Sequence, residues 1–187
     1  MQSVLETHFL SVDDYLSGEQ LSDIRHEYVD GVVYAMAGTS DVHNIIAGNF
    51  FASFHAHLRG GKCRPFMSDV KARLQLGAKQ IFYYPDIMVA CDPRDTNAFF
   101  KDFPKVIVEV LSESTERADR SEKFWNYTQI PTLEEYLLAS QTKKEVTVFR
   151  RSQQWKPEVL YLPDQELHLP SLSFKTPLHV IYDGVDL

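Results

Sequence analysis

The stretch KVIVEVL, residues 105–111, constrains the fold of this chain more than any other feature. Five of its seven residues are apolar and β-prone, a composition typical of a strand that is buried on both faces of its sheet. Glu109 interrupts this run on the same face as Ile107 and Leu111. An ionised carboxylate in such a place costs on the order of several kcal/mol. Glu109 must therefore have a partner, take a proton or bind a metal ion.

Further β-prone runs lie on both sides of this strand. Asp30-Gly31, within residues 25–38, predicts a tight hairpin. Residues 62–76 alternate loosely and lead through GAKQ into residues 81–93, which predicts a second hairpin. Two more strands are predicted around a Lys143-Lys144 turn, at residues 134–140 and 145–151, and the tail adds short strands of undefined register.

Helical patterns interrupt these strands. Ser11 to Leu16 predicts a short capped helix. From Ser40 to the glycine pair at 60–61, apolar residues recur at steps of four, which predicts a long amphipathic helix: Val42, Ile46, Phe50, Phe54 and Leu58. Residues 115–127 predict one further helix, ended by Ile130-Pro131. Strand runs interrupted by two sizeable helices indicate an α/β fold with a mixed central β-sheet flanked by helices.

The length and composition limit the classes of protein to which this chain can belong. A chain of 187 residues, 44% hydrophobic and 24% charged, suits a single globular domain over residues 1–187. No apolar run approaches the roughly 18 residues of a membrane helix, and the first residues lack the basic segment of a secretory signal. We therefore expect a cytoplasmic protein without a membrane segment.

The two cysteines, Cys63 and Cys91, lie far apart and form no C-x-x-C pair. This spacing suggests neither a disulfide framework nor a structural zinc site. We expect both to be small buried side chains.

The formal charge of the chain is 19 − 26 = −7. This charge argues against a constant, non-specific grip on nucleic acid, because such binding depends mainly on Lys and Arg at phosphates. A nucleic-acid partner would require a local basic patch. One candidate patch is close together in sequence, although a solvated strand face with its turns is the favoured explanation: Arg59, Lys62, Arg64, Lys71, Arg73 and Lys79.

A second acid, Asp86, follows Tyr84-Pro85 and precedes an apolar run in the same manner as Glu109. Carboxylates from neighbouring strands can converge, and two that share a site cannot both stay ionised without a cation between them. Hard oxygen ligands with no nearby His or Cys cluster favour Mg²⁺ or Mn²⁺ over zinc. Asp86 and Glu109 are therefore predicted to bind a divalent cation, the alternative being a structural acid paired with an arginine.

These motifs together resemble the Uma2 family, a former domain of unknown function placed in the PD-(D/E)XK nuclease superfamily. The resemblance covers nearly the whole chain, and the motifs occur in the family's order. They are HEYVDGVVYAMAG near the start, His43-Asn44, Tyr84-Pro85-Asp86, Val108-Glu109-Val110-Leu111-Ser112, Ser114-Thr115, Asp119-Arg120 to Lys123, and IPTLEEYLLAS.

The resemblance implies a restriction endonuclease-like core with a metal held by Asp86 and Glu109. The superfamily's lysine would stand two residues after the glutamate, where this chain has Leu111. The resemblance places the lysine's role on Lys123, in the following helix. It also implies that Glu27 is the N-terminal acid that often completes the superfamily's metal site, either by binding a second ion or by accepting a proton from water.

The function implied by this resemblance is that of an endonuclease that hydrolyses DNA by a metal-activated water, with the lysine positioning the nucleophile or offsetting phosphate charge. One alternative is an inactive nuclease-fold module that binds nucleic acid or protein, as the missing strand lysine would suggest. A second alternative is a hydrolase of smaller phosphoesters. The acidic net charge implies either that the ion supplies much of the local positive potential or that a homodimer brings two basic stretches together.

Simpler roles remain open for several of these residues. Asp119 and Lys123 form an i,i+4 pair that can support a helix, and Glu27 can be an exposed strand residue. A role for His43 in binding phosphate or a metal is open, but we expect it to cap or pack the long helix. Asp69 can face the site from the neighbouring strand, but we expect it to form a surface salt bridge. The aromatic residues around the motifs are expected to serve packing rather than base stacking: Tyr83, Tyr84, Trp125 and Tyr127.

Overall fold

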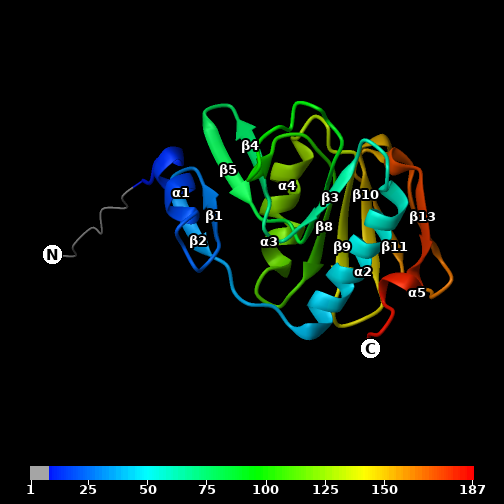
Figure 1. The fold of residues 1–187 in the computed structure, drawn as a ribbon. Helices are drawn as coiled ribbons and strands as arrows, with labels where there is room; N and C mark the ends of the chain where they lie inside the picture. The colour runs from blue at the N-terminus through cyan, green and yellow to red at the C-terminus, as the bar shows by residue number, and fades with distance from the viewer. Residues whose placement is uncertain (1–8) are drawn as a thin grey trace.

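Two main β-sheets and a set of mostly short helices make up residues 9–187 of the chain, the part that the computed structural model describes (Figure 1). The larger sheet has six strands in the order β11-β10-β9-β8-β6-β3. Their bounds are β3 (Arg64–Met67), β6 (Ile87–Ala90), β8 (Pro104–Leu111), β9 (Glu135–Ser140), β10 (Val146–Arg150) and β11 (Pro157–Leu160). The pair β8–β9 is parallel and the other neighbours are antiparallel, so the predicted mixed central sheet is present.

The smaller sheet has five strands in the order β2-β1-β5-β4-β7. They are β1 (His26–Val29), β2 (Val32–Ala35), β4 (Lys71–Leu76), β5 (Lys79–Tyr83) and β7 (Phe100–Lys101). The remaining elements are β12 (Glu166–Leu169), β13 (Phe174–Pro177), α1 (Val12–Glu19), α2 (Asp41–Leu58), α3 (Glu116–Arg120), α4 (Glu122–Thr128), α5 (Leu178–Ile181) and two 3-10 turns, Arg151–Gln153 and Pro170–Leu172.

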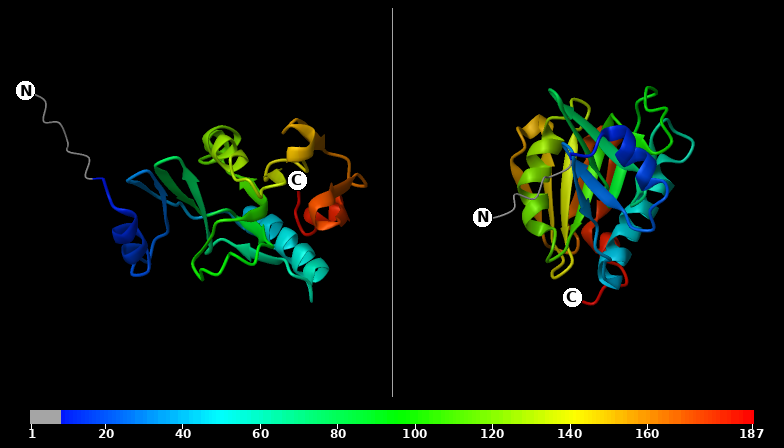
Figure 2. Two further views of the ribbon diagram at one scale, coloured as in Figure 1. Left: turned by 90° about the horizontal axis from the view of Figure 1, so that it is seen from above. Right: turned by 90° about the vertical axis from the view of Figure 1, so that its left-hand side faces the viewer.

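Strand β8 lies inside the larger sheet and is covered on both faces, as its apolar composition predicts. Val106, Val108 and Val110 belong to the core cluster that includes the buried side of α2. Ile107 and Leu111 point to the opposite face, into the cluster that contains residues of α4 and the smaller sheet. The view from above shows α2 and α4 on opposite sides of the larger sheet (Figure 2).

Both predicted hairpins form, the second between β4 and β5. The predicted run 62–76 is not one strand, because it divides into β3 and β4, which belong to different sheets. Asp30 and Gly31 have φ of 50° and 95°, the left-handed backbone that a tight turn between β1 and β2 requires. The long helix starts after Ser40, whose side chain accepts a hydrogen bond from the His43 backbone N–H, as an N-cap does.

The chain crosses from the smaller sheet to the larger one between Tyr83 and Ile87. β5 ends at Tyr83, β6 begins at Ile87, and Pro85-Asp86 lies in the connection. Asp86 is therefore held at the start of a fully buried strand, next to β8.

The prediction of one continuous helix over residues 115–127 is wrong. The backbone of Ser121, at φ −123° and ψ −88°, separates α3 from α4. The break is absent from the hydrophobic pattern because Ser121 carries no signal, such as proline, that would interrupt helical periodicity.

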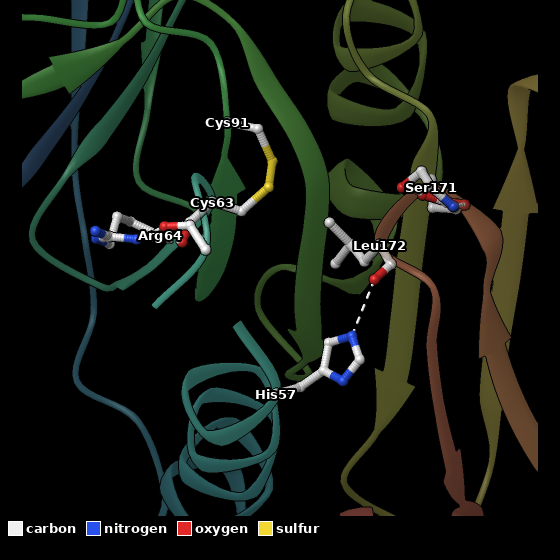
Figure 3. Close-up of a disulfide and its surroundings, with 8 residues drawn as sticks. His57, Cys63, Arg64, Cys91, Ser171 and Leu172 are labelled. Atoms are coloured by element: carbon white, nitrogen blue, oxygen red, sulfur yellow. Dashed lines mark hydrogen bonds between the residues drawn. A yellow bond between two sulfur atoms is a disulfide. The ribbon is translucent and has the colours of Figure 1, made fainter. Parts of the chain in front are cut away.

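The prediction that the cysteines remain unpaired is also wrong, because Cys63 and Cys91 form a disulfide (Figure 3). Cys63 precedes β3 and Cys91 follows β6, and these two strands pair with Arg64 opposite Ala90. The antiparallel register therefore places the flanking cysteines opposite one another, with their Cα atoms 4.0 Å apart. This register could not be read from two cysteines that lie 28 residues apart.

The six basic residues of the candidate patch do not share one surface role. Lys71 is buried and donates a hydrogen bond to the Tyr84 hydroxyl, and Arg73 is paired with Asp102. Among residues 9–187, no helix combines the length and the apolar character needed to cross a membrane.

Candidate active site

One cavity of about 210 Å³ brings together all four site residues predicted from the sequence. Glu27 comes from β1, Asp86 from the connection before β6, Glu109 from β8 and Lys123 from α4. The loop after β2, the start of α2 and the end of β8 complete its walls.

Asp86, just before β6, lies beside Glu109 of β8 in this cavity. The Asp86 backbone N–H donates a hydrogen bond to Glu109 Oε2 (3.1 Å), and the Val110 N–H donates to Asp86 Oδ2 (2.7 Å). These contacts follow from the register of β6 and β8, in which Ile87 pairs with Val108. The two acids therefore converge, as their positions in the sequence predicted.

Lys123 places its ammonium among three carboxylates. Its Nζ lies 2.8 Å from Glu27 Oε1, and 3.5 Å from both Glu109 Oε1 and Asp119 Oδ1. The side chain of Lys123 is only 9% exposed. Its burial and multiple acidic partners indicate more than the simple i,i+4 helix support that a pairing with Asp119 alone would provide.

The surroundings shift the pKa values of these groups. Burial raises the pKa of Glu109, and the nearby Lys123 ammonium opposes that rise. Burial also acts to lower the pKa of Lys123, but the carboxylates of Glu109, Glu27 and Asp119 outweigh it, so the pKa of Lys123 is raised. Lys123 therefore stays protonated at neutral pH.

Two further hydrogen bonds fix the acids. The Tyr127 hydroxyl donates to Glu109 Oε1 (3.0 Å), and the Tyr84 backbone N–H donates to Glu27 Oε1 (3.3 Å). Tyr127 is fully buried, and burial raises the pKa of its hydroxyl. It therefore acts as a neutral donor that orients Glu109.

His43 contacts an acid of the site and does not only cap or pack the long helix. Its Nε2 lies 3.2 Å from Asp86 Oδ2, and its side chain is 7% exposed. The imidazole of His43 therefore faces the Asp86 carboxylate at ion-pair distance. The sequence signal was the position of His43 in the first turn of a capped helix, which alone does not reveal the partner.

The donor set fits a divalent cation. Four carboxylates line the cavity against one ammonium: Glu27, Asp86, Glu109 and Asp119. Among residues 9–187, Asp119 Oδ1 is the one buried side-chain nitrogen or oxygen without a hydrogen-bond partner. This oxygen lies 3.5 Å from the Lys123 ammonium but accepts no hydrogen bond, and the excess negative charge suits a site that holds a positive ion.

No group of three or more His, Cys, Asp or Glu side chains within residues 9–187 is arranged as a metal cage. Mg²⁺ does not require such a cage, because it is usually held by one or two carboxylates and keeps several waters.

Several residues of the cavity wall were not assigned a role from the sequence. Tyr34 and Met36 contribute an apolar part of the wall beside the acids. A second group contributes hydroxyls at the end of β8 and the start of α3: Ser112, Ser114 and Thr115. The family motif contained these hydroxyl residues, but local patterns do not show which of them face a cavity.

The expectation that the aromatic residues near the motifs serve packing is confirmed for Tyr83, Tyr84 and Tyr127, which are at most 4% exposed. Trp125 differs, because it is 66% exposed and does not serve as a core residue. Asp69 forms the predicted surface salt bridge, with Arg25, at 3.1 Å.

A solved structure shares this architecture. The crystal structure of a protein from Anabaena variabilis, described as a putative nuclease belonging to DUF820, matches 92% of this chain and 97% of its own with a TM-score of 0.75. The sequence identity is 17%, so the similarity concerns the fold. The chain is an α/β protein with a restriction endonuclease-like fold.

The family follows from the sequence comparisons. The family model of Uma2, with the description "Putative restriction endonuclease", matches residues 12–179. The uncharacterized Synechocystis protein slr1290 is 38% identical over 178 residues, covering 94% of this chain and 93% of its own. A second Synechocystis protein, sll1609, is 31% identical over 160 residues and covers 83% and 89%. The chain belongs to the Uma2 family, as its motifs predicted.

Proposed function

We propose that this protein is a metal-dependent endonuclease that hydrolyses DNA phosphodiester bonds. The observation that carries this proposal is the convergence of Asp86, Glu109 and Lys123 on one cavity. The description of the Uma2 family and the fold shared with the Anabaena protein agree with it.

Asp86 and Glu109 are the residues that would hold Mg²⁺ or Mn²⁺. The Val110 N–H donates to Asp86 Oδ2 and His43 Nε2 lies 3.2 Å from the same oxygen, which leaves Oδ1 available to a cation. A bound ion supplies Lewis-acid chemistry, because it lowers the pKa of water and stabilises negative charge on a phosphodiester.

Lys123 offsets the negative charge of the phosphate that enters the cavity. Its pKa is raised, so the ammonium carries its positive charge throughout the neutral range. Such preorganised charge stabilises a phosphoryl-transfer transition state more effectively in a partly dry site than it would in water. Glu27, at 2.8 Å, holds this ammonium in place and is within reach of the same cavity as a proton acceptor.

The position of Lys123 also argues against the alternative that the protein is an inactive nuclease-fold module. The superfamily's strand position is occupied by Leu111, which packs in the core. The Lys123 Nζ reaches within 3.5 Å of Glu109 from α4. The site therefore contains a lysine, and its absence from the strand does not indicate lost catalysis.

The proposal is tested with supercoiled plasmid incubated with Mg²⁺, Mn²⁺ or EDTA. We expect nicked and linear products with the metals and none with EDTA. Asp86→Asn and Glu109→Gln should each abolish cleavage, while Asp164→Asn, at a carboxylate that is 99% exposed, should not.

Two other results would contradict the proposal. Binding of DNA without cleavage in any metal would indicate the inactive module. Hydrolysis of bis-p-nitrophenyl phosphate without cleavage of DNA, lost in the same variants, would indicate a hydrolase of smaller phosphoesters.

A further inference from the structure

We propose that Tyr34 and Met36 form a stacking ledge for one unpaired base of the nucleic-acid strand bound at the candidate active site. The inference deepens the proposed nuclease function and rests on it. It assigns a substrate class: strands that present a nucleotide outside a regular duplex at the point of cleavage.

The hairpin register places the ledge beside the catalytic groups. Tyr34 pairs with Glu27 across β1 and β2, and directly opposite residues of an antiparallel pair project to the same face, with Cβ atoms about 4.5–5.5 Å apart. Glu27 reaches Lys123 on that face. Met36 lies two residues beyond Tyr34, its N–H still bonded to the Arg25 carbonyl at 2.8 Å, so it shares the face. Both side chains line the cavity.

Tyr34 differs from the other tyrosines of the site in its exposure. It is 54% exposed, whereas Tyr83, Tyr84 and Tyr127 are 4%, 3% and 0% exposed and are occupied by packing. β2 is the edge strand of the smaller sheet, so no further strand covers this side of the hairpin. A large aromatic face is therefore open to a molecule that enters the cavity.

The charges around the ledge decide which part of a nucleotide it receives. The positive charges of Lys123 and a bound cation attract one phosphate of the strand. A second phosphate on the ledge would be repelled, because Glu27, Asp86 and Glu109 line the same cavity. The neutral, flat base is the part of the adjoining nucleotide that fits an apolar aromatic surface.

The substrate class follows from base geometry. Inside a duplex, both faces of a base are covered by its neighbours, so an aromatic side chain stacks on a base only where the strand is single or the base is flipped out. Base–aromatic stacking tolerates any base, because every base has a π-face. The ledge therefore selects strand geometry and not sequence.

The test is a double-mutant cycle in which Tyr34→Ala is one change and removal of the bases from the strand is the other. Affinity is measured by fluorescence anisotropy at one fixed salt concentration, with Ca²⁺ as the cation and a gel to check that the strand stays intact. The probes are a single-stranded oligonucleotide and an abasic strand of equal length. We expect Tyr34→Ala to weaken binding of the normal strand by about 5- to 150-fold, as loss of one stacked base does, and to leave the abasic strand unaffected.

Two variants act as controls. Tyr34→Phe keeps the ring and should bind like the wild type. Tyr161→Ala removes a tyrosine of similar exposure, 61%, that follows β11, and should change nothing. Equal affinity of Tyr34→Ala and wild type for the normal strand would overturn the inference, as would an equal loss on both strands, which would show a structural role.

Cleavage assays separate this inference from the proposed function. If the wild type cleaves DNA but Tyr34→Ala has the same effect on the normal and the abasic strand, the proposal of a stacking ledge is wrong and the nuclease proposal stands. If no metal supports cleavage but Tyr34→Ala loses base-dependent binding, the ledge stands and the nuclease proposal is wrong.

Discussion

His43 Nε2 lies 3.2 Å from Asp86 Oδ2, so the first turn of the long helix contacts the acid at the start of β6. The Val110 N–H donates to the same oxygen at 2.7 Å. Neighbours that contact a metal-binding carboxylate orient it toward its metal, and their removal typically weakens metal binding by about 10- to 100-fold. We therefore predict that His43→Ala lowers Mn²⁺ affinity by that factor, as measured by isothermal titration calorimetry.

Two variants control this prediction. His43→Gln retains an N–H donor and should recover part of the affinity. His55→Ala changes an exposed histidine of the same helix that stacks on Phe51, and should bind Mn²⁺ like the wild type. Unchanged affinity in His43→Ala would show that Asp86 needs no support from the helix.

Lys123→Met should abolish cleavage and destabilise the metal-free protein. Removing one partner from a buried ionic group costs about 3–5 kcal/mol, because the remaining charges stay buried and unpaired; here these are the carboxylates of Glu27, Glu109 and Asp119. Urea unfolding measures the loss. Lys143→Met, at a lysine that is 61% exposed, should change stability by less than about 0.5 kcal/mol. A Lys123→Met protein that cleaves at the wild-type rate contradicts the assigned role.

The disulfide should contribute to stability and not to metal binding. It links residues 28 positions apart, and closing a loop of this size stabilises a protein by about 2–4 kcal/mol. The double variant Cys63→Ser with Cys91→Ser should lose that amount in urea unfolding. Its Mn²⁺ affinity should not change, because Cys91 follows β6 whereas Asp86 precedes it. A weakened metal site in the double variant would show that the two ends of β6 are coupled.

Glu135 should make stability depend on pH. It is 3% exposed and accepts a hydrogen bond from the Ser171 N–H at 3.1 Å; burial raises its pKa, although the Ser171 bonds oppose the rise. A carboxyl whose pKa is higher in the folded state gives stability that is complete below the unfolded pKa, about 4.3, and is lost as pH rises through the folded pKa.

The comparison variant is Glu135→Gln, which cannot ionise. The unfolding free energy of the wild type, relative to this variant, should fall as pH rises above the unfolded pKa of about 4.3 and through the raised folded pKa. Urea unfolding across this range measures it, with exposed Glu113→Gln as the control. A difference that stays constant with pH would contradict the raised pKa.

Signals carried by neighbouring residues predicted much of this fold. The spacing of apolar residues predicted α2, and the turn at Asp30-Gly31 predicted the β1–β2 hairpin, because both depend on local backbone preference. The separation of α3 from α4 and the disulfide depend on tertiary packing and strand register. Neither could be read from Ser121 or from the spacing of the cysteines.

In the candidate site, too, some features were predictable from local sequence and others were not. Convergence of Asp86 and Glu109 was predictable, because each acid interrupts an apolar strand and a buried acid requires compensation. Lys123 and Glu27 were assigned only through the family motifs, since neither has an unusual local setting. The roles of His43 and Tyr34 depend on which side chains meet across elements, and that information emerges only from the folded chain.

The most direct test of the account is a crystal structure of the protein soaked in Mn²⁺, with the ion located by its anomalous scattering. The account predicts one strong peak in the cavity, within coordination distance of oxygens from both Asp86 and Glu109, with the Lys123 ammonium close by. A cavity without Mn²⁺, or an ion bound only at other residues, would contradict the claim that these two acids form a metal site.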